Sequence, residues 1–551
     1  MSHQPKIPRL RSAVPRRQDG HKPLRHIPLD VYLEIFDYFQ VGESFSEREC
    51  KIIFSNSIPV CRLFRAICLP RRLRSLTLSS QQKGLIKFTH TKFHEPETDL
   101  CEYVRTLRIV DWRPESPELS ESDIDSENED EIVQTNPNTW VYRGIMSRLC
   151  ETLPRFQNVT ELIIDYAMLS PSIFVHIPLM NNLYSVDIAY CKFDDPLTDR
   201  ARRLIYHMTP QTPWRKLRFV ANTGCEKALH ALATMASTSA LESLTTMEWS
   251  VAHAFLTQKK NALVGLTMLD IPCDHPDVVG KFLAMTPTIT TLTLTGLPIF
   301  TERSQAHLQL PPSALPNLHT LKCNYLLLEE LVSGRPVSSV QVFTTIFGTP
   351  VGTLDASSTM DILSVVGRSS AQIKLLGIEE TTSPLTGAGL NLKDFTHLEQ
   401  FTFYVSVHKD ILTKMIKSTQ LPATDADVWH PTVPIMNIVF DHYLQSAVMP
   451  LYDLQIDHDL CLFLASLFPG ATTITTTPGI EWRKHMRESP SAPVWKPVII
   501  ARDIVRSHVR SWADAFWVMR DYEGCLEALF EEHELDVDPL LRSVLGIKGG
   551  E

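Results

Sequence analysis

One six-residue pattern of hydrophobic positions recurs along most of the chain: apolar, any two residues, apolar, any one residue, apolar. Copies begin at residues 104, 159, 183, 214, 266, 289, 318, 351, 373, 398 and 435, with weaker copies at 241 and 471. From 159 to 398 the starts are 22 to 33 residues apart, and 55 residues separate the first two copies. A single copy means little in a chain that is 44% hydrophobic, so the regular spacing carries the prediction.

Each copy predicts a short strand whose apolar side chains point inward and whose intervening side chains point outward. Segments between the copies, such as 225–237, 276–285 and 358–367, can form helices or irregular turns. One strand and one return per about 20 to 29 residues is typical of a leucine-rich repeat. We therefore predict a leucine-rich-repeat-like α/β solenoid over residues 100–480, the alternative being another α/β arrangement with similarly spaced strands. We identify the asparagine or cysteine that usually follows the pattern only at Cys191.

The outward strand positions predict a binding surface of mixed charge with a threonine-rich middle. Such a surface suits an unknown protein substrate better than a phosphate backbone. Threonine is also a common strand residue, so the threonines alone do not indicate binding. The predicted outward residues are Arg105, Arg108, Arg215, Lys216, Arg218, Thr290, Thr291, Thr293, His319, Lys322, Glu399, Gln400 and Tyr404.

Residues 24–79 precede the repeats and predict a small helical module. Leu29, Leu33 and Phe36 fall on one helical face, and the positions at 31, 35 and 39 broaden that apolar stripe. A second helical stretch follows over 51–69, and Pro59 inside it predicts a break near Ser57. A module of this size cannot bury so many large apolar groups alone. It is therefore either a cap packed on the repeats or a docking element for another protein.

The same residues resemble an F-box. The resemblance is carried by the opening Ile27-Pro28-Leu29-Asp30-Val31, by Ile35-Phe36, by Val60-Cys61-Arg62 with Phe64, and by the closing run 73–78. Two positions depart from the family pattern: Phe64 stands where many members have tryptophan, and Pro59 directly precedes the Val-Cys-Arg step.

The resemblance implies docking onto the small adaptor subunit of an SCF-type cullin–RING ubiquitin ligase, and through the adaptor onto cullin. Recognition of this kind uses apolar anchors in a groove. The resemblance assigns adaptor binding to Pro28, Leu29, Ile35, Phe36, Val60, Cys61 and Phe64.

The last segment, 481–551, predicts a helical C-terminal cap. Ile500, Ile504 and Val505, then Val509, Trp512 and Phe516, follow helical spacing. A solenoid needs a terminal cap with a polar outer side, and a partner-binding helix is the alternative.

Charge is concentrated in two segments that predict disorder. The formal net charge is −10, but residues 114–131 alone carry nine carboxylates and no basic residue. We expect 113–138 to be an acidic disordered insertion between the first two repeats, because like charges repel and little can be buried. Residues 1–23 predict a disordered basic tail, since residues 1–25 carry seven basic residues and one acidic residue. The remainder is nearly neutral, which excludes a general nucleic-acid or anionic-membrane binder.

Three serines of the acidic insertion are candidate phosphorylation sites. Ser120, Ser122 and Ser126 each have a carboxylate three residues later, a pattern that acidophilic kinases accept. Phosphate there would deepen the negative field of the insertion.

Sequence motifs of catalysis, cofactors and metals are missing from this chain of 551 residues. Its nucleotide-loop, nucleophile-elbow and zinc spacings are all unmatched, so we predict no cofactor, no metal and no enzymatic activity. No apolar run is long enough for a membrane helix, and the N-terminus lacks the apolar core of a signal peptide. The 11 cysteines form no CxxC pair, which indicates reduced thiols and a cytoplasmic or nuclear protein.

Together these features predict a non-catalytic substrate receptor. Residues 24–79 would bind the ligase adaptor, and the solenoid would hold a target protein for ubiquitination. The alternative is a scaffold or regulatory solenoid that binds proteins outside any ligase.

Overall fold

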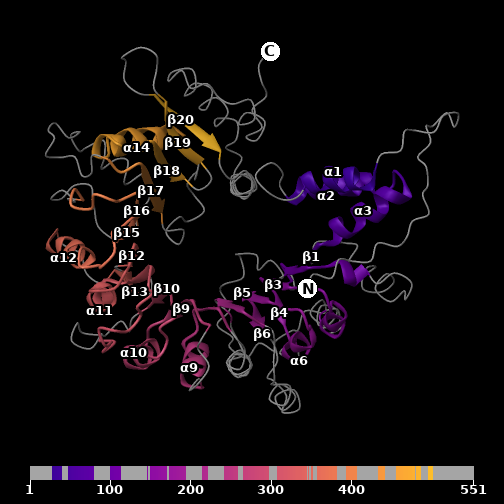
Figure 1. Ribbon diagram of the computed structural model, residues 1–551, viewed down its shortest axis with the longest axis horizontal. Coiled ribbons are helices and arrows are strands. Elements are labelled where there is room, and N and C mark those ends of the chain that lie inside the picture. The colour runs from indigo at the N-terminus through magenta and orange to yellow at the C-terminus, as the bar shows by residue number, and fades with distance from the viewer. Residues whose placement is uncertain are drawn as a thin grey trace, which may run out of the picture. The chain divides into compact units, whose positions relative to one another are not determined.

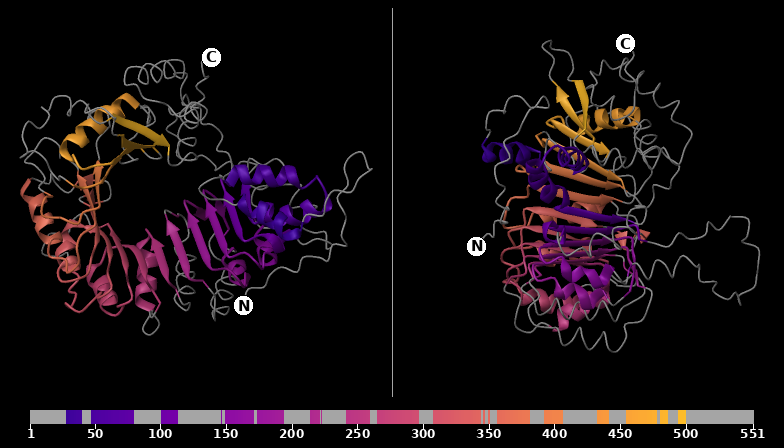
Figure 2. Two further views of the ribbon diagram at one scale, coloured as in Figure 1. Left: turned by 45° about the horizontal axis from the view of Figure 1, so that its top comes forward. Right: turned by 90° about the vertical axis from the view of Figure 1, so that its right-hand side faces the viewer.

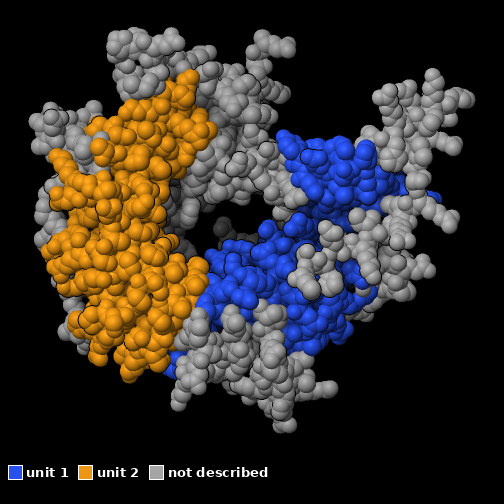
Figure 3. All heavy atoms as spheres, viewed as in Figure 1, with its two compact units in different colours: residues 1–265 blue, residues 266–551 orange. Residues whose placement is uncertain are grey.

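A computed structural model of the chain describes residues 28–39, 47–79, 100–112, 146, 149–170, 173–193, 214–220, 222, 241–258, 265–296, 307–343, 345–346, 349–350, 356–380, 392–405, 432–440, 454–477, 480–485 and 494–499. The chain divides into two compact units, residues 1–265 and 266–551, which Figure 3 colours separately. The predicted tail 1–23 and acidic insertion 113–138, with Ser120, Ser122 and Ser126, lie outside the described residues, as does the C-terminal segment from 500 onward.

Unit 1 begins with three helices, α1 (Leu29–Tyr38), α2 (Glu47–Ser57) and α3 (Arg62–Leu73) (Figure 1). The break predicted near Ser57 is confirmed, because α2 ends at that residue and Pro59 lies between the helices. The Cys61 thiol caps α3 by accepting a hydrogen bond from the Phe64 N–H at 3.4 Å. A core formed by Phe36, Cys50, Phe54, Ile67 and Cys68 holds the three helices together.

The strands of unit 1 pair in chain order, and every pair is parallel. They are β1 (Ser75–Ser79), β2 (Thr106–Val110), β3 (Glu161–Asp165), β5 (Ser185–Ala189), β7 (Lys216–Val220) and β8 (Ser243–Thr246). Smaller elements are η2 (Leu100–Tyr103), η4 (Leu153–Arg155), β4 (Met168–Leu169), α6 (Ile173–His176), η5 (Ile177–Leu179), β6 (Lys192–Phe193) and α9 (Trp249–Gln258). Inward residues of neighbouring strands, such as Leu107 and Leu162, align in register and are fully buried.

A ladder of side-chain hydrogen bonds follows the strands of unit 1. The donors stand eight residues after the start of a repeat pattern, and each bonds the carbonyl of an earlier strand. Trp112 Nε1 donates to Leu78 O at 2.8 Å, the Cys191 thiol donates to Ile164 O at 3.6 Å, and Asn222 Nδ2 donates to Ile188 O at 2.9 Å. The prediction that only Cys191 fits this position was therefore incomplete, since Asn222 and Trp112 also occupy it.

Unit 2 continues the same plan and ends differently. Its parallel strands are β9 (Met268–Pro272), β10 (Thr291–Thr295), β11 (Thr320–Asn324), β12 (Ser339–Phe343), β15 (Leu375–Glu380), β16 (Gln400–Val405), β17 (Ile435–Phe440) and β18 (Thr473–Thr477). β19 (Ile480–His485) and β20 (Val494–Ile499) then pair antiparallel. Other elements are α10 (Pro276–Ala284), η7 (Tyr325–Leu327), α11 (Leu328–Val332), β13 (Thr345–Ile346), β14 (Thr349–Pro350), α12 (Ala356–Val366) and α14 (Leu454–Leu467).

The predicted fold class is confirmed: an α/β, leucine-rich-repeat-like solenoid preceded by a small helical module. Within unit 2 the helices α10, α11 and α12 lie along one side of the strands (Figure 2). Two of the predicted return segments, 276–285 and 358–367, do form helices, namely α10 and α12.

Two predictions about unit 2 need correction. The repeat copy at 351–356 lies outside the described residues except for Ala356, which begins α12. An overlooked copy at 337–342, carried by Val337, Val340 and Val342, forms β12. The predicted helical cap is a β-hairpin where it is described, over 480–485 and 494–499. Pro497 disfavours a helix but is accepted in β20, which stands last in the strand order.

Candidate binding surfaces

The first helix carries apolar side chains on two opposite faces. Phe36 is 5% exposed, and Leu33 packs with it in the core of the helical module. On the other face Val31, Ile35 and Tyr38 follow the spacing i, i+4, i+7 and are 38%, 47% and 70% exposed. A single stripe would suffice to pack α1 on its own module, so the second stripe is available to a partner.

The predicted adaptor-binding residues separate into an exposed set and a packed pair. Pro28, Leu29, Ile35, Val60 and Cys61 are exposed, with Leu29 at 42% and Val60 at 65%. Phe36 is buried and Phe64 half-buried; their rings meet edge to face with centroids 5.1 Å apart. Phe36 and Phe64 therefore hold the helices together, while the exposed residues form the surface.

The exposed apolar surface extends beyond the residues that the resemblance assigned. Val31 and Tyr38 on α1 and Ile52 on α2, which is 50% exposed, were not among them. The spacing of Val31 to Ile35 was visible in the sequence, but the pattern did not separate the buried stripe from the exposed one.

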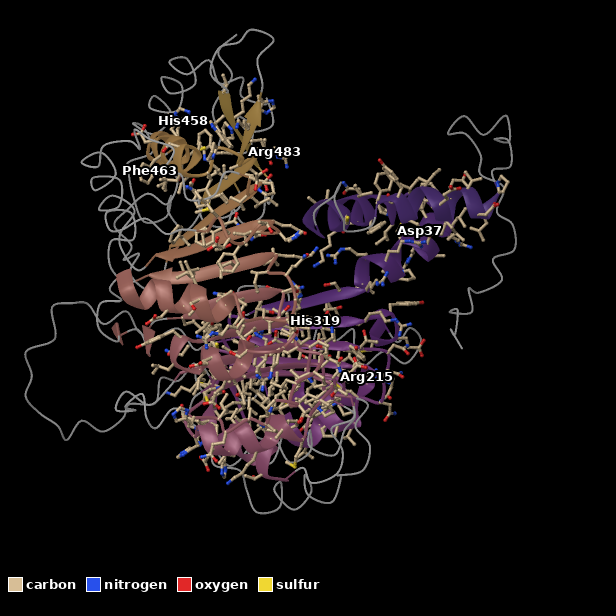
Figure 4. All side chains as sticks on the ribbon, turned by 60° about the vertical axis from the view of Figure 1, so that its left-hand side comes forward. Asp37, Arg215, His319, His458, Phe463 and Arg483 are labelled. Carbon is tan, nitrogen blue, oxygen red and sulfur yellow. The ribbon has the colours of Figure 1, made fainter. Side chains whose placement is uncertain are left out.

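Ion pairs and hydrogen bonds fix the module internally. Asp37 Oδ1 accepts from Arg71 Nη2 at 2.5 Å and from Arg71 Nε at 3.1 Å, which joins α1 to α3. Arg72 Nε donates to Ser55 Oγ at 2.8 Å and joins α3 to α2. Figure 4 shows Asp37 among these helices.

The outward side of the unit 1 strands carries a polar network at the strand starts. Arg215 pairs with Glu242 at 2.5 Å, and the Tyr184 hydroxyl donates to the same carboxylate at 2.8 Å. Lys216 Nζ lies 5.7 Å from the centre of the Tyr184 ring. The hydrogen bond from Arg215 lowers the pKa of Glu242, so this carboxylate stays ionised and the network keeps its charges. Arg215 is labelled in Figure 4.

Acidic residues accumulate nearer the strand ends. Arg218 Nη1 donates to both carboxylate oxygens of Asp187 at 2.9 Å. Burial nevertheless raises the pKa of Asp187, and Arg218 opposes this shift without cancelling it. Burial, followed by the nearby Asp187 charge, also raises the pKa of Asp165, whose Oδ1 is buried without a hydrogen-bond partner.

The turn after each of three unit 1 strands contains a residue with positive φ. Asp111, Tyr166 and Tyr190 have φ values of 56°, 51° and 52°. The Tyr166 and Tyr190 rings stack with centroids 4.8 Å apart. Gly296 occupies the corresponding position of a repeat in unit 2 with φ 61°, so the repeat turn itself imposes this conformation.

Most of the predicted outward positions of unit 2 are at least half exposed, but one is not. Thr293 is 7% exposed, and its register neighbours Asp270 and Lys322 carry longer side chains on both sides. Tyr404 is half-buried against Gly377, where an added Cβ would lie 3.0 Å from its ring. His319, labelled in Figure 4, is exposed, and Lys374 pairs with the exposed Glu399 at 2.8 Å.

The described residues contain no group of three or more His, Cys, Asp or Glu side chains that could hold a metal ion. All nine cysteines that the structure describes are free, and eight of them are buried. Burial raises the pKa of Cys68 to about 11 and of Cys150 to about 12, which leaves them protonated and unreactive at neutral pH. None of the helices in the described ranges is long and apolar enough to cross a membrane.

No protein-family model and no curated protein matches this chain. Among solved structures, a leucine-rich-repeat protein of Leptospira interrogans is 11% identical over 74% of this chain and 88% of that chain, with a TM-score of 0.24. The leucine-rich-repeat ectodomain of a plant membrane receptor kinase from Arabidopsis thaliana is 12% identical over 58% of this chain and 42% of that chain, with a TM-score of 0.18. Both scores are too low to support an inference, so the fold assignment depends on the strand order and the side-chain ladder.

Proposed function

We propose that this chain is the substrate-recognition subunit of an SCF-type cullin–RING ubiquitin ligase. Residues 24–79 dock onto the adaptor subunit and through it onto cullin, and the solenoid holds an unknown target protein for ubiquitination. The proposal is supported by the ordered F-box-like motif, whose residues Leu29, Ile35 and Val60 are exposed apolar side chains. A stable monomer gains nothing from exposing them, whereas apolar anchors are what a docking helix needs.

The solenoid supports target binding through the composition of its outward strand positions. In unit 1 these positions carry both signs of charge together with the aromatic ring of Tyr184. A surface of mixed charge with aromatic residues is suited to a protein partner rather than to nucleic acid. The chain contributes no catalytic group in this proposal; it brings the target close to the transferring enzyme, in the cytoplasm or the nucleus.

The second candidate is a scaffold or regulatory solenoid that works outside any ligase. It is favoured by the departures at Pro59 and Phe64. Pro59 lies in the turn before the Val-Cys-Arg step and Phe64 packs against Phe36, so neither adds the contact that a family tryptophan would supply.

Affinity purification of the tagged chain from cells with the proteasome blocked separates the two candidates. A ligase subunit is expected to recover adaptor and cullin together with a ubiquitinated protein whose abundance rises when the chain is deleted. A scaffold recovers partners without cullin, and the abundance of those partners does not change on deletion.

A further inference from the structure

A basic pocket lies in unit 1 where the helical module meets the first strands. Its volume is about 490 Å³, within the range of ligand-binding pockets. Its basic lining residues are Lys51 from α2, Arg71 and Arg72 from α3, Arg74 at the end of α3, and Arg108 from β2.

The charges of the pocket are only partly balanced. Five basic residues face two acidic ones, Asp37 and Glu161, which gives a formal charge of +3 (5 − 2). Asp37 is paired with Arg71, and Glu161 accepts a hydrogen bond from Thr106 Oγ1 at 3.1 Å. The remaining positive charge favours an anionic occupant with several charged groups.

The chain itself supplies a polyanion next to this pocket. Arg108 lines the pocket, and Trp112 follows it by four residues, about 13 Å along an extended strand. The nine carboxylates begin at Glu115, three residues after Trp112, and Ser120 follows five residues later. Eight residues beyond Trp112 reach as far as about 26 Å, so this segment can return to the pocket.

We propose that the basic pocket binds the acidic insertion, residues 114–131, and that phosphorylation of Ser120, Ser122 and Ser126 strengthens the contact. Each phosphate adds about 1.5 to 2 negative charges and accepts hydrogen bonds from arginine. Because the insertion is tethered, its effective concentration at the pocket is in the millimolar range, so modest charge complementarity suffices. This inference is independent of ligase membership; it connects phosphorylation to the contact between the helical module and the strands of unit 1.

The test uses the full-length chain and a separate peptide of residues 113–131 with phosphoserine at 120, 122 and 126. In one variant the nine acidic residues of the insertion are changed to Asn or Gln, so that the insertion no longer competes for the pocket. We expect this variant to bind the peptide, in a manner weakened by salt, and the wild-type chain to bind it about tenfold more weakly. Arg72→Gln with Arg74→Gln, introduced into the same variant, should abolish binding.

The control is Arg368→Gln with Lys374→Gln, which removes two exposed basic residues of unit 2 and should leave peptide binding unchanged. Circular dichroism of each variant verifies that it is folded. The proposal is overturned if the neutralised variant fails to bind the peptide, or if the wild-type chain binds it equally well. Binding that survives the loss of Arg72 and Arg74 also overturns it, since the peptide would then bind elsewhere.

Discussion

Asn222 connects two neighbouring repeats through both ends of its side-chain amide. Its Nδ2 donates to Ile188 O at 2.9 Å, and its Oδ1 accepts the main-chain N–H of Cys191 at 3.0 Å. The side chain is 7% exposed, so water cannot replace either bond. This single residue therefore satisfies two buried main-chain groups at the turn that follows a strand, and it defines how consecutive repeats stack in unit 1.

Replacing Asn222 by alanine is expected to destabilise unit 1 by about 2 to 4 kcal/mol, because a buried carbonyl and a buried N–H lose their partners together. Urea unfolding followed by circular dichroism measures the change. Asn181→Ala is the matched control, because the Asn181 amide bonds only the exposed Gln157 side chain. The ladder has no structural importance if the two variants unfold at the same urea concentration.

Gly280 in α10 provides a second test of packing. An added Cβ would lie 1.8 Å from Leu308 O, and main-chain atoms cannot move aside as a flexible side chain can. Gly280→Ala should therefore destabilise unit 2 by about 3 kcal/mol or more. Gly367→Ala is the control, because its nearest neighbours are 3.5 Å away. Equal thermal unfolding of both variants would contradict the close approach of α10 to Leu308.

The strand positions could be predicted from the sequence because each repeat buries the same three apolar residues. The buried series of Leu107, Leu162 and Val186 appears directly in the recurring pattern. The side-chain ladder was harder to predict, since tryptophan, cysteine and asparagine all serve as donors at one position. Thr293 shows a further limit: its burial depends on the side chains of neighbouring strands, which a pattern within one strand does not contain.

The docking surface was predicted in outline but not in detail. The periodicity of α1 is apolar on two faces, and sequence alone does not decide that Phe36 faces the module core while Ile35 faces outward. The hairpin at 480–499 was missed for a related reason: Trp482 and Trp495 are both buried, and a short run rich in large apolar residues suits a strand as well as a helix.

Asp165 should make the stability of unit 1 depend on pH. Burial and the Asp187 charge raise its pKa in the folded protein, so the folded state binds its proton more tightly than the unfolded state. Stability therefore falls as pH rises from the ordinary carboxyl pKa through this raised value. Asp165→Asn should unfold at a higher urea concentration than wild type at pH 7, and the difference should shrink below the ordinary carboxyl pKa.

The exposed Asp361 provides the control for that measurement, since Asp361→Asn changes a carboxylate that lies on the surface of α12. If Asp165→Asn and Asp361→Asn have the same effect at every pH, burial of Asp165 does not influence stability.

Cys61 should be the most readily alkylated of the described cysteines, because it alone is exposed. Iodoacetamide treatment at pH 7.5 with mass spectrometry is expected to modify Cys61 within minutes and Cys68, whose pKa burial raises to about 11, far more slowly. If the adaptor covers the Val60–Cys61 turn, its addition should slow Cys61 alkylation about tenfold and leave Cys68 unchanged. Unprotected Cys61 in a complex that still forms would place the adaptor elsewhere.

The most direct test of the proposed function is the binding of purified adaptor to the full-length chain, measured by co-elution and by isothermal titration. The wild-type chain should form a stable complex, and Ile35→Asp with Val60→Asp should weaken it by at least about 30-fold, as the loss of a central apolar anchor does. Met247→Asp with Met285→Asp alters two similarly exposed residues outside the helical module and should bind like wild type. A wild-type chain that does not bind the adaptor, or an Ile35 and Val60 variant that binds it fully, would contradict the assignment as a ligase substrate receptor.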